Sequence, residues 1–192
     1  MKKIILDTLE QSIATKEGAV RGNVDNLLAG AERIAESLAS GHKILLFGNG
    51  GSAADAQHIA AEFVNRFAVE RAPLAALALT TDTSVLTSIG NDYRFDDIFS
   101  KQIRALGKEG DVAWGISTSG NSKNIVSAVK TAREMGLLTF GMTGSGGGLA
   151  DCAEILFTVP SNVTARIQEA HITLAHILCD LVDRILFPEK YR

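Results

Sequence analysis

This sequence has few cysteines, few prolines and a small net charge. Only two cysteines occur among 192 residues, Cys152 and Cys179, and they form neither a CxxC pair nor a disulfide framework. Their small apolar neighbours predict buried thiols, which suits a reducing, cytoplasmic location. A net charge of −3 with no basic block gives no electrostatic support for direct nucleic-acid binding. Three prolines and no Pro/Ser-rich linker predict a single domain spanning residues 1–192.

Long hydrophobic runs are also missing. No stretch reaches about 18 apolar residues, so the sequence predicts no membrane span. The N-terminal segment reaches the acidic Asp7 without a long apolar core, so no signal peptide is expected. Hydrophobic residues nevertheless make up 46% of the chain and charged residues 21%, which is enough apolar material for a globular core.

What the sequence does contain is an alternation of short apolar runs and helical patterns. The runs predict strands at 43–47, 74–79, 112–116, 138–142 and 155–159, and helical spacing follows at 52–67, 124–135 and 164–187. Strands that are apolar nearly throughout are typical of a parallel sheet covered on both faces. The sequence therefore predicts an α/β fold, a three-layer doubly wound sandwich with a five-stranded parallel sheet.

The first 40 residues have a different pattern. Apolar side chains recur at spacings of three and four from Ile4 to Leu38, which predicts helices. These N-terminal helices have no strand of their own to cover, and we expect them to pack against another subunit. Further helices are expected at 82–89 and 96–106, with a turn at Gly90-Asn91-Asp92 between them.

Two loops of small and hydroxyl-bearing residues follow predicted strands and precede predicted helices. The first is Gly48-Asn49-Gly50-Gly51-Ser52 and the second is Ser117-Thr118-Ser119-Gly120-Asn121-Ser122. In such turns, main-chain N–H groups and hydroxyls converge at the positive end of a helix dipole, where an anion binds. A helix cap needs one hydroxyl, whereas the second loop carries four, so the pattern favours phosphate binding. Neither loop is a GxGxxG or Walker A motif, so no nucleotide cofactor is predicted.

His58 and Glu62 lie four residues apart in the helix predicted after the first loop, so they share one of its faces. Asp55 lies near that face. A solvated polar stripe would explain these residues equally well. However, the neighbours of Glu62 are largely apolar, and a carboxylate in such surroundings has a raised pKa or a nearby cation. Glu62 is therefore a candidate base or metal ligand.

The last predicted helix carries Gln168, His171 and His176 among apolar residues. A histidine on an apolar helix is more often a core residue than a catalyst, and periodicity alone does not choose between His171 and His176. Gln168 and His176 are eight residues apart, which is about 12 Å of rise and about 80° around the helix axis. They can reach one site only with extended side chains or from different subunits.

Together these motifs resemble the sugar isomerase (SIS) family, and within it the bacterial phosphoheptose isomerases. The matching segments are GNGGSAADAQHIAAEF (48–63), SIGNDYRFDDIFSKQI (88–103), GDVAWGISTSGNSKNI (110–125) and ARIQEAHITLAHIL (165–178). The resemblance covers nearly the whole chain. It implies the flavodoxin-like SIS fold and a homotetramer with active sites at subunit interfaces. It also implies isomerisation of a sugar phosphate, sedoheptulose 7-phosphate to D-glycero-D-manno-heptose 7-phosphate, through an enediol, as the first step of ADP-heptose synthesis for lipopolysaccharide.

By this resemblance, Glu62 and His176 are the catalytic pair, with Glu62 moving a proton between carbons and His176 moving one between oxygens. One zinc ion per subunit is implied at His58, Glu62, Gln168 and His176. The residues implied to bind the substrate and its phosphate are Asn49, Gly50, Gly51, Ser52, Glu62, Asn91, Asp92, Ser117, Thr118, Ser119, Ser122 and Gln168.

A paralogue in the same family binds the bacterial replication initiator and is not an isomerase. Residues 64–71 and 179–188 look more like that paralogue than like the typical enzyme. The paralogue lacks the carboxylate and the imidazole at the catalytic positions, whereas this chain has Glu62 and His176. We therefore expect an isomerase first. The alternatives are a non-catalytic protein that binds the replication initiator and an isomerase of another sugar phosphate.

Overall fold

Five parallel strands form the centre of the molecule. In a computed structural model, which describes residues 1–191, they are β1 (Ile44–Gly48), β2 (Ala76–Ala78), β3 (Val112–Ser117), β4 (Leu138–Thr143) and β5 (Ile155–Thr158). Their order across the sheet is β2-β1-β3-β4-β5. This confirms the predicted doubly wound α/β fold, and the order is that of flavodoxin-like proteins.

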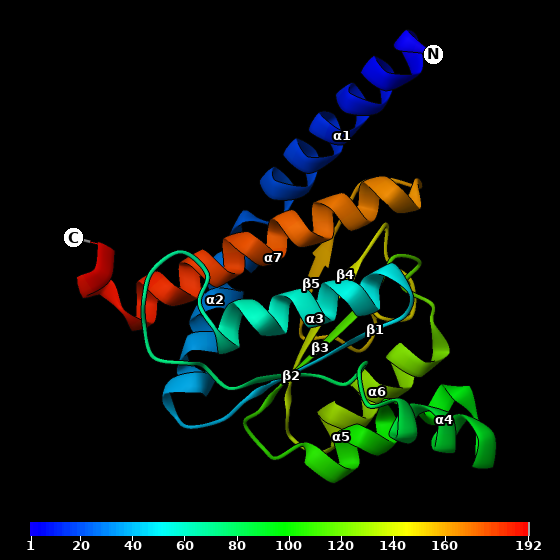
Figure 1. Cartoon of the computed structure of the whole chain (residues 1–192), viewed down its shortest axis with the longest axis vertical. Helices are drawn as coiled ribbons and strands as arrows, with labels where there is room; N and C mark the ends of the chain where they lie inside the picture. Colours follow the sequence, from blue (N-terminus) through cyan, green and yellow to red (C-terminus); the bar gives the residue numbers. More distant parts are fainter. Residues whose placement is uncertain (192) are drawn as a thin grey trace.

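Helices cover both faces of this sheet (Figure 1). One face carries α2 (Val24–Ala39), α3 (Gly51–Val64) and α7 (Thr164–Leu186), and the other carries α5 (Ser100–Leu106) and α6 (Lys123–Glu134). Strands β1 and β3 are buried along their whole length, as expected for strands covered on both sides. From β1 the chain adds β2 toward one edge of the sheet, and from β3 it adds β4 and β5 toward the other edge. Strands β1 and β3 therefore flank the switch point where ligands of such folds bind.

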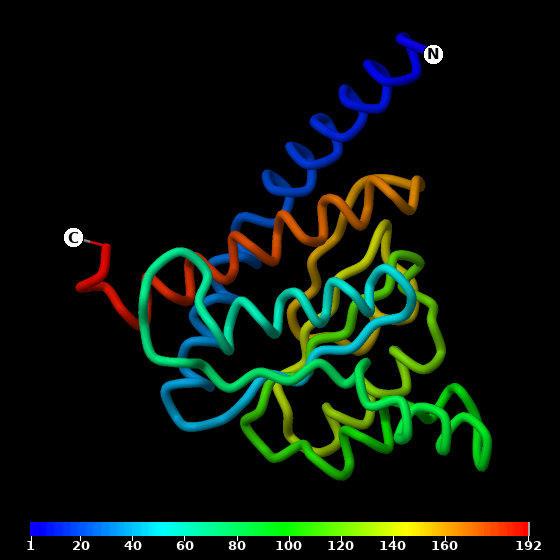
Figure 2. Tube along the Cα trace, viewed as in Figure 1, coloured from blue at the N-terminus to red at the C-terminus, as the bar shows by residue number. Residues whose placement is uncertain are grey.

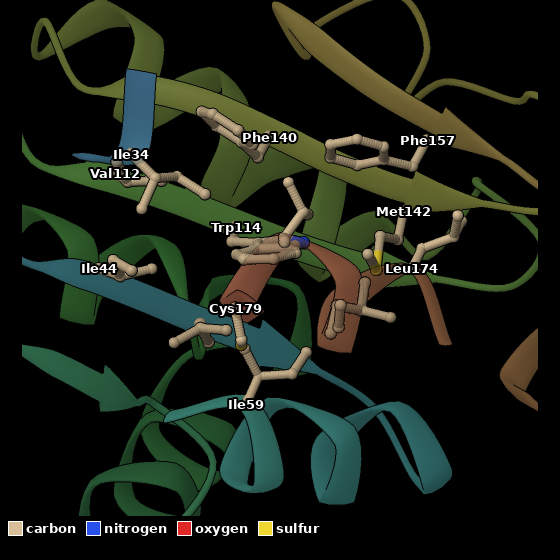
Figure 3. Packing of buried hydrophobic residues seen from close by; sticks show 14 of the residues in the cluster. Ile34, Ile44, Ile59, Val112, Trp114, Phe140, Met142, Phe157, Leu174 and Cys179 are labelled. Carbon is tan, nitrogen blue, oxygen red and sulfur yellow. The ribbon is translucent and has the colours of Figure 1, made fainter. Parts of the chain in front are cut away.

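Aromatic packing fixes α3 and α7 against the sheet. Trp114 of β3 lies 6.0 Å from Phe140 and 6.4 Å from Phe157, measured between ring centroids. Figure 3 shows Ile59 of α3 and Leu174 of α7 on the same side of this cluster, and all five side chains are at most 1% exposed. Because this core is close-packed, side chains on the outer surfaces of α3 and α7 have fixed relative positions.

The N-terminal segment is helical, as predicted, and consists of two helices. They are α1 (Lys2–Gly22) and α2, with a break at Asn23. The Asn23 amide donates hydrogen bonds to the carbonyls of Ala19 and Thr158, at 2.6 and 2.8 Å, and accepts one from the N–H of Thr158 at 3.0 Å. Figures 1 and 2 show α1 projecting beyond the sheet. Among the helices of residues 1–191, none combines the length and hydropathy needed to cross a bilayer.

Several predicted boundaries are wrong, and two of them bear on the site. Gly90-Asn91-Asp92 is not a turn but the last part of α4 (Thr83–Asp92), because Asp82 accepts a hydrogen bond from Val85 N–H at 2.9 Å and starts a helix that continues through these residues. Helix α3 ends at Val64 rather than at Phe67. The guanidinium of Arg71 binds main-chain carbonyls in the last turn of this helix. The remaining short elements are the 3₁₀ helices Phe95–Asp97 and Pro188–Tyr191.

Candidate active site

The two predicted anion-binding loops lie side by side at the carboxyl ends of β1 and β3. We call residues 48–52 and 117–122 together the carboxyl edge. Gly48 pairs with Ile116 in the register of these two strands, so both loops leave the sheet at the same level. The side-chain amides of Asn49 and Asn124 then join them through two reciprocal hydrogen bonds of 2.9 and 2.8 Å.

In the second loop the hydroxyls converge at the start of α6. The Ser117 hydroxyl donates to Ser122 Oγ at 3.1 Å, and the N–H of Asn121 donates to Ser119 Oγ at 3.1 Å. Ser122 is the N-cap residue of α6, so this group of hydroxyls faces the positive end of the helix dipole. Gly120 has a φ of +68°, and a β-carbon there would overlap the main-chain oxygen of Gly146. The tight turn therefore requires glycine at this position.

A polar pocket of about 210 Å³ opens beside the second loop. It is lined by Thr118, Ser119, Ser145, Ser161, Asn162, Thr164 and Ile167. Nearly all of its lining side chains carry a hydroxyl or an amide, which are the groups that hydrogen-bond sugar hydroxyls and phosphate oxygens. The carboxyl edge thus offers both an anion site and room for a polyhydroxylated ligand next to it.

The second constellation lies between two helices, on their solvent side. His58 and Glu62 of α3 meet His176 of α7, and one ligand atom from each lies within 4.8 Å of the others. Glu62 Oε1 is 3.0 Å from His58 Nε2, and the Nε2 atoms of His58 and His176 are 3.4 Å apart. Phe67 packs against the His176 ring at 5.3 Å. We call these three polar residues the α3–α7 flank.

The electrostatics of the α3–α7 flank favour a neutral His176. Partial burial lowers its pKa, the neighbouring His58 lowers it further, and Glu62 acts in the opposite direction. A neutral imidazole can accept a proton or a metal ion. Two histidines and one carboxylate are also a common donor set of catalytic zinc sites, which keep a fourth position open. On the same helix face, burial raises the pKa of Asp55 while His58 lowers it.

The two histidines of α7 have different surroundings. His171 is fully buried, its Nε2 lies 3.1 Å from the carbonyl of Thr143, and burial lowers its pKa to about 4. His176 instead reaches the α3–α7 flank. His171 is therefore the core histidine and His176 the available one.

Three other predicted site residues lie away from the α3–α7 flank. Gln168 lies against the first loop, where a β-carbon on Gly51 would overlap its amide nitrogen. Asn91 and Asp92 lie at the exposed end of α4, on the opposite side of the sheet, with the Asn91 amide donating to Asp92 Oδ1 at 2.9 Å. Within one chain, the structure therefore brings together only His58, Glu62 and His176 of the residues implied in catalysis and metal binding.

The carboxyl edge and the α3–α7 flank are well separated in one chain. Ser52 and Glu62 are ten residues apart on α3, which corresponds to about 15 Å of rise. Asn124, which our sequence interpretation did not include in the site, orders the carboxyl edge through Asn49. An asparagine in the first turn of a helix that follows a hydroxyl-rich loop was the available signal for it.

Comparison with known proteins places this geometry in context. A family model described as "SIS domain" matches residues 9–144. The phosphoheptose isomerase of Nitratidesulfovibrio vulgaris (strain Hildenborough) is 57% identical over 187 residues, which are 97% of this chain and 90% of that protein. The phosphoheptose isomerase of Aquifex aeolicus is 54% identical over 187 residues, which cover 97% of this chain and 96% of that protein.

Solved structures agree with these relatives. A phosphoheptose isomerase from Neisseria gonorrhoeae superposes with a TM-score of 0.89 at 48% identity, covering 95% of this chain and 98% of that chain. One from Francisella tularensis superposes with a TM-score of 0.91 at 39% identity, covering 95% of this chain and 97% of that chain.

Proposed function

The chain belongs to the SIS-domain family and, within it, to the phosphoheptose isomerases, and we propose that it converts sedoheptulose 7-phosphate to D-glycero-D-manno-heptose 7-phosphate. Identity above 50% over nearly the full length of such relatives supports this reaction. The observation that carries it in the structure is the α3–α7 flank, where a carboxylate and two imidazoles meet within 4.8 Å. Residues that serve only to bind a partner do not require this arrangement.

The chemistry we assign to the flank is aldose–ketose isomerisation. The Glu62 carboxylate removes a proton from carbon 1 of the ketose, which gives an enediolate across carbons 1 and 2 that becomes an enediol once the oxygen on carbon 2 is protonated. Glu62 then returns the proton to carbon 2, while His176 carries a proton from the oxygen on carbon 1 to the oxygen on carbon 2. Each positioned proton transfer contributes about 10²–10⁴-fold to the rate. The lowered pKa of His176 keeps its imidazole neutral, which suits a group that accepts one proton and donates another.

A metal ion fits the same residues, because two imidazoles and a carboxylate are a zinc donor set. We propose that His58, Glu62 and His176 hold zinc. When bound, zinc would polarise the substrate carbonyl and stabilise negative charge on its oxygen. Gln168 of the same chain lies at Gly51, so we propose that any contact of Gln168 with a metal is made in the site of another subunit.

The proposed substrate is anchored at the carboxyl edge, where Ser117, Thr118, Ser119 and Ser122 supply hydroxyls and Asn49, Gly50, Gly51 and Ser52 form the neighbouring turn. About 15 Å of α3 separates this edge from Glu62 in one chain. A seven-carbon sugar phosphate does not extend that far between its phosphate and its carbonyl. We therefore propose that each active site combines the carboxyl edge of one subunit with the α3–α7 flank of another, and that Asn91 and Asp92 join the substrate site in the assembly.

We propose a homotetramer as that assembly. Helix α1 supports it, because Ile4, Ile5, Leu6, Leu9 and Ile13 are each more than 50% exposed and project from the body of the subunit. An apolar face of this kind is normally buried by a partner. Light scattering of the purified protein at micromolar concentration should give four times the chain mass, and a monomer mass would contradict the proposal.

The biological setting we propose is the cytoplasmic synthesis of heptose for lipopolysaccharide or another surface polysaccharide. The decisive experiment is direct turnover of sedoheptulose 7-phosphate by the purified protein, with and without a chelator. We expect turnover of about 1 s⁻¹ or faster at saturation, reduced by the chelator and restored by zinc. A tetramer that binds sugar phosphates but turns none of them over, with or without zinc, would instead support the initiator-binding alternative. Turnover of only a shorter sugar phosphate would keep the mechanism and change the substrate.

A further inference from the structure

Arg71 is a buried guanidinium just beyond the end of α3. Its side chain is 1% exposed, and arginine is rarely so buried unless its donors are paired. Its Nη2 donates to the carbonyl of Glu62 at 2.9 Å, and its Nη1 donates to the carbonyl of Phe63 at 2.7 Å. Longer hydrogen bonds reach the carbonyls of Asn65 and Ala72. Arg71 therefore binds carbonyls that have no partner within the helix, of which the Phe63 carbonyl also accepts from the N–H of Leu74 at 3.0 Å.

The same guanidinium is bound to α7. Arg71 Nε donates to Asp183 Oδ1 at 2.8 Å, and the Asp183 side chain is fully buried. Asp183 follows His176 by seven residues, which is two helical turns, so both side chains lie on one face of α7. Arg71 belongs to the loop between α3 and β2, and Figure 2 shows this wide loop beside the C-terminal half of α7. A single side chain thus joins the main chain of Glu62 to the helix that carries His176.

Stability alone does not account for this arrangement. Removing two charges from water costs free energy, and replacing a buried ion pair with apolar residues is often neutral or stabilising. Roughly a third to a half of helices end with a left-handed residue, usually glycine, and need no charge there. What a planar guanidinium adds is a fixed geometry, because its donors point in set directions. Geometry matters at an active site, where a displacement of about 1 Å costs about 10²-fold in rate.

We infer that Arg71 is a positioning residue: held by Asp183, it fixes the last turn of α3 so that Glu62 faces His176 at the distance that proton transfer requires. The inference rests on the proposed function of Glu62 and His176. It adds two residues that touch neither substrate nor reacting atoms and that act through the main chain of Glu62.

The test replaces the ion pair with apolar side chains, as Arg71→Met together with Asp183→Leu, so that no unpaired charge stays buried. The matched control is Arg184→Gln with Asp180→Asn, which removes an Arg–Asp pair of 2.7 Å on the exposed side of α7. Three quantities are measured for each variant: thermal stability, kcat and KM for sedoheptulose 7-phosphate, and amide hydrogen exchange of residues 58–66.

For Arg71→Met/Asp183→Leu we expect a lowered thermal midpoint, because the carbonyls of Glu62 and Phe63 lose donors, and, well below that midpoint, a loss of about 10²-fold in kcat with a change in KM below about threefold. The amides of residues 58–66 should exchange at least about tenfold faster, whereas the control variant should match the wild type throughout. Unchanged kcat together with unchanged exchange would overturn the inference, because the pair would then serve the fold alone.

The double variant could fail to fold, or the wild type could lack turnover, and each result still tests the inference. If the double variant does not fold, Arg71→Lys replaces it, since lysine keeps the charge beside Asp183 but cannot also bind the carbonyls of Glu62 and Phe63. The same loss of kcat supports the inference, and wild-type kcat overturns it. If the wild type itself turns over no sedoheptulose 7-phosphate, the proposed function fails, and the exchange of residues 58–66 still decides whether Arg71 holds the end of α3.

Discussion

The carboxyl edge and the α3–α7 flank are built in different ways. Each loop of the carboxyl edge is a short stretch of sequence, and its shape follows from glycines, hydroxyls and a helix start within six residues of one another. The flank has no local sequence motif, because Glu62 and His176 meet only where α3 and α7 pack on the same face of the sheet. Their geometry depends on core residues such as Ile59 and Leu174 beneath them.

This difference separates binding from chemistry. An anion needs converging N–H and O–H groups, and one turn of chain can supply them. A proton transfer between carbons needs two groups at a set distance, and here that distance is set by packing between distant segments. It follows that substitutions in one region should leave the other region nearly intact.

The largest effect is expected from Glu62→Gln, which tests the flank alone. The amide keeps the shape of the carboxylate but cannot accept the proton, so kcat should fall by at least about 10²-fold. Binding of inorganic phosphate at the carboxyl edge should be unchanged, as measured by calorimetry. Glu70→Gln, at a residue exposed on the loop beyond α3, is the control and should behave as the wild type. Near-normal turnover by Glu62→Gln would remove this carboxylate from the mechanism.

His176→Ala should have the next largest effect, a loss of about 10²-fold in kcat with assembly preserved. The ring is only partly buried, so its removal should cost about 1 kcal/mol in the free energy of unfolding. His171→Ala, five residues earlier on α7, should give the opposite result, because that ring lies in the core: a clear loss of stability. If both variants lost stability alike and His176→Ala kept its turnover, His176 would be a packing residue.

Sequence reasoning succeeded where the determinants are local. The five strands and the two loops were predictable because apolar runs and glycine–hydroxyl turns act within a few residues. Strand β2 was predicted as 74–79 but spans only Ala76–Ala78, since it lies at the edge of the sheet and pairs with β1 alone. Asn91 and Asp92 were placed in a turn because such residues favour turns, but the capped helix α4 simply continues through them.

Sequence reasoning failed where the determinants are tertiary. Periodicity on α7 could not separate His171 from His176, and only the resemblance to known isomerases chose between them. Nothing in the local sequence indicated that Arg71 would be buried, because its partners are main-chain carbonyls of α3 and a carboxylate of α7. Hydrogen bonds to main-chain atoms leave no pattern in the types of residue involved.

Ser119→Ala with Ser122→Ala tests the carboxyl edge alone. A hydrogen bond to a charged group contributes about 1.5–3 kcal/mol, and water can replace part of it, so the Kd for a sugar phosphate should rise by at least about tenfold. The affinity for inorganic phosphate should fall in parallel, and kcat at saturation should change much less than it does in Glu62→Gln. Ser127→Ala, within α6 and outside the second loop, is the control. Unchanged affinity by calorimetry would refute the phosphate assignment.

The last prediction concerns the core beneath both regions, through the charge of His171. Its pKa of about 4 in the folded protein lies below the value of about 6.5 expected when the chain is unfolded. Between these pH values the unfolded state binds more protons, so stability falls as the pH is lowered from about 6.5 to about 4, by about 3 kcal/mol in total. His171→Gln cannot titrate in this range, and its Nε2 can still donate toward the Thr143 carbonyl as the ring does. Denaturant unfolding at one protein concentration should therefore show that the free energy of unfolding falls less between pH 6.5 and 4 in the variant than in the wild type. Equal pH dependence of the two proteins would mean that His171 does not control the acid sensitivity of this core.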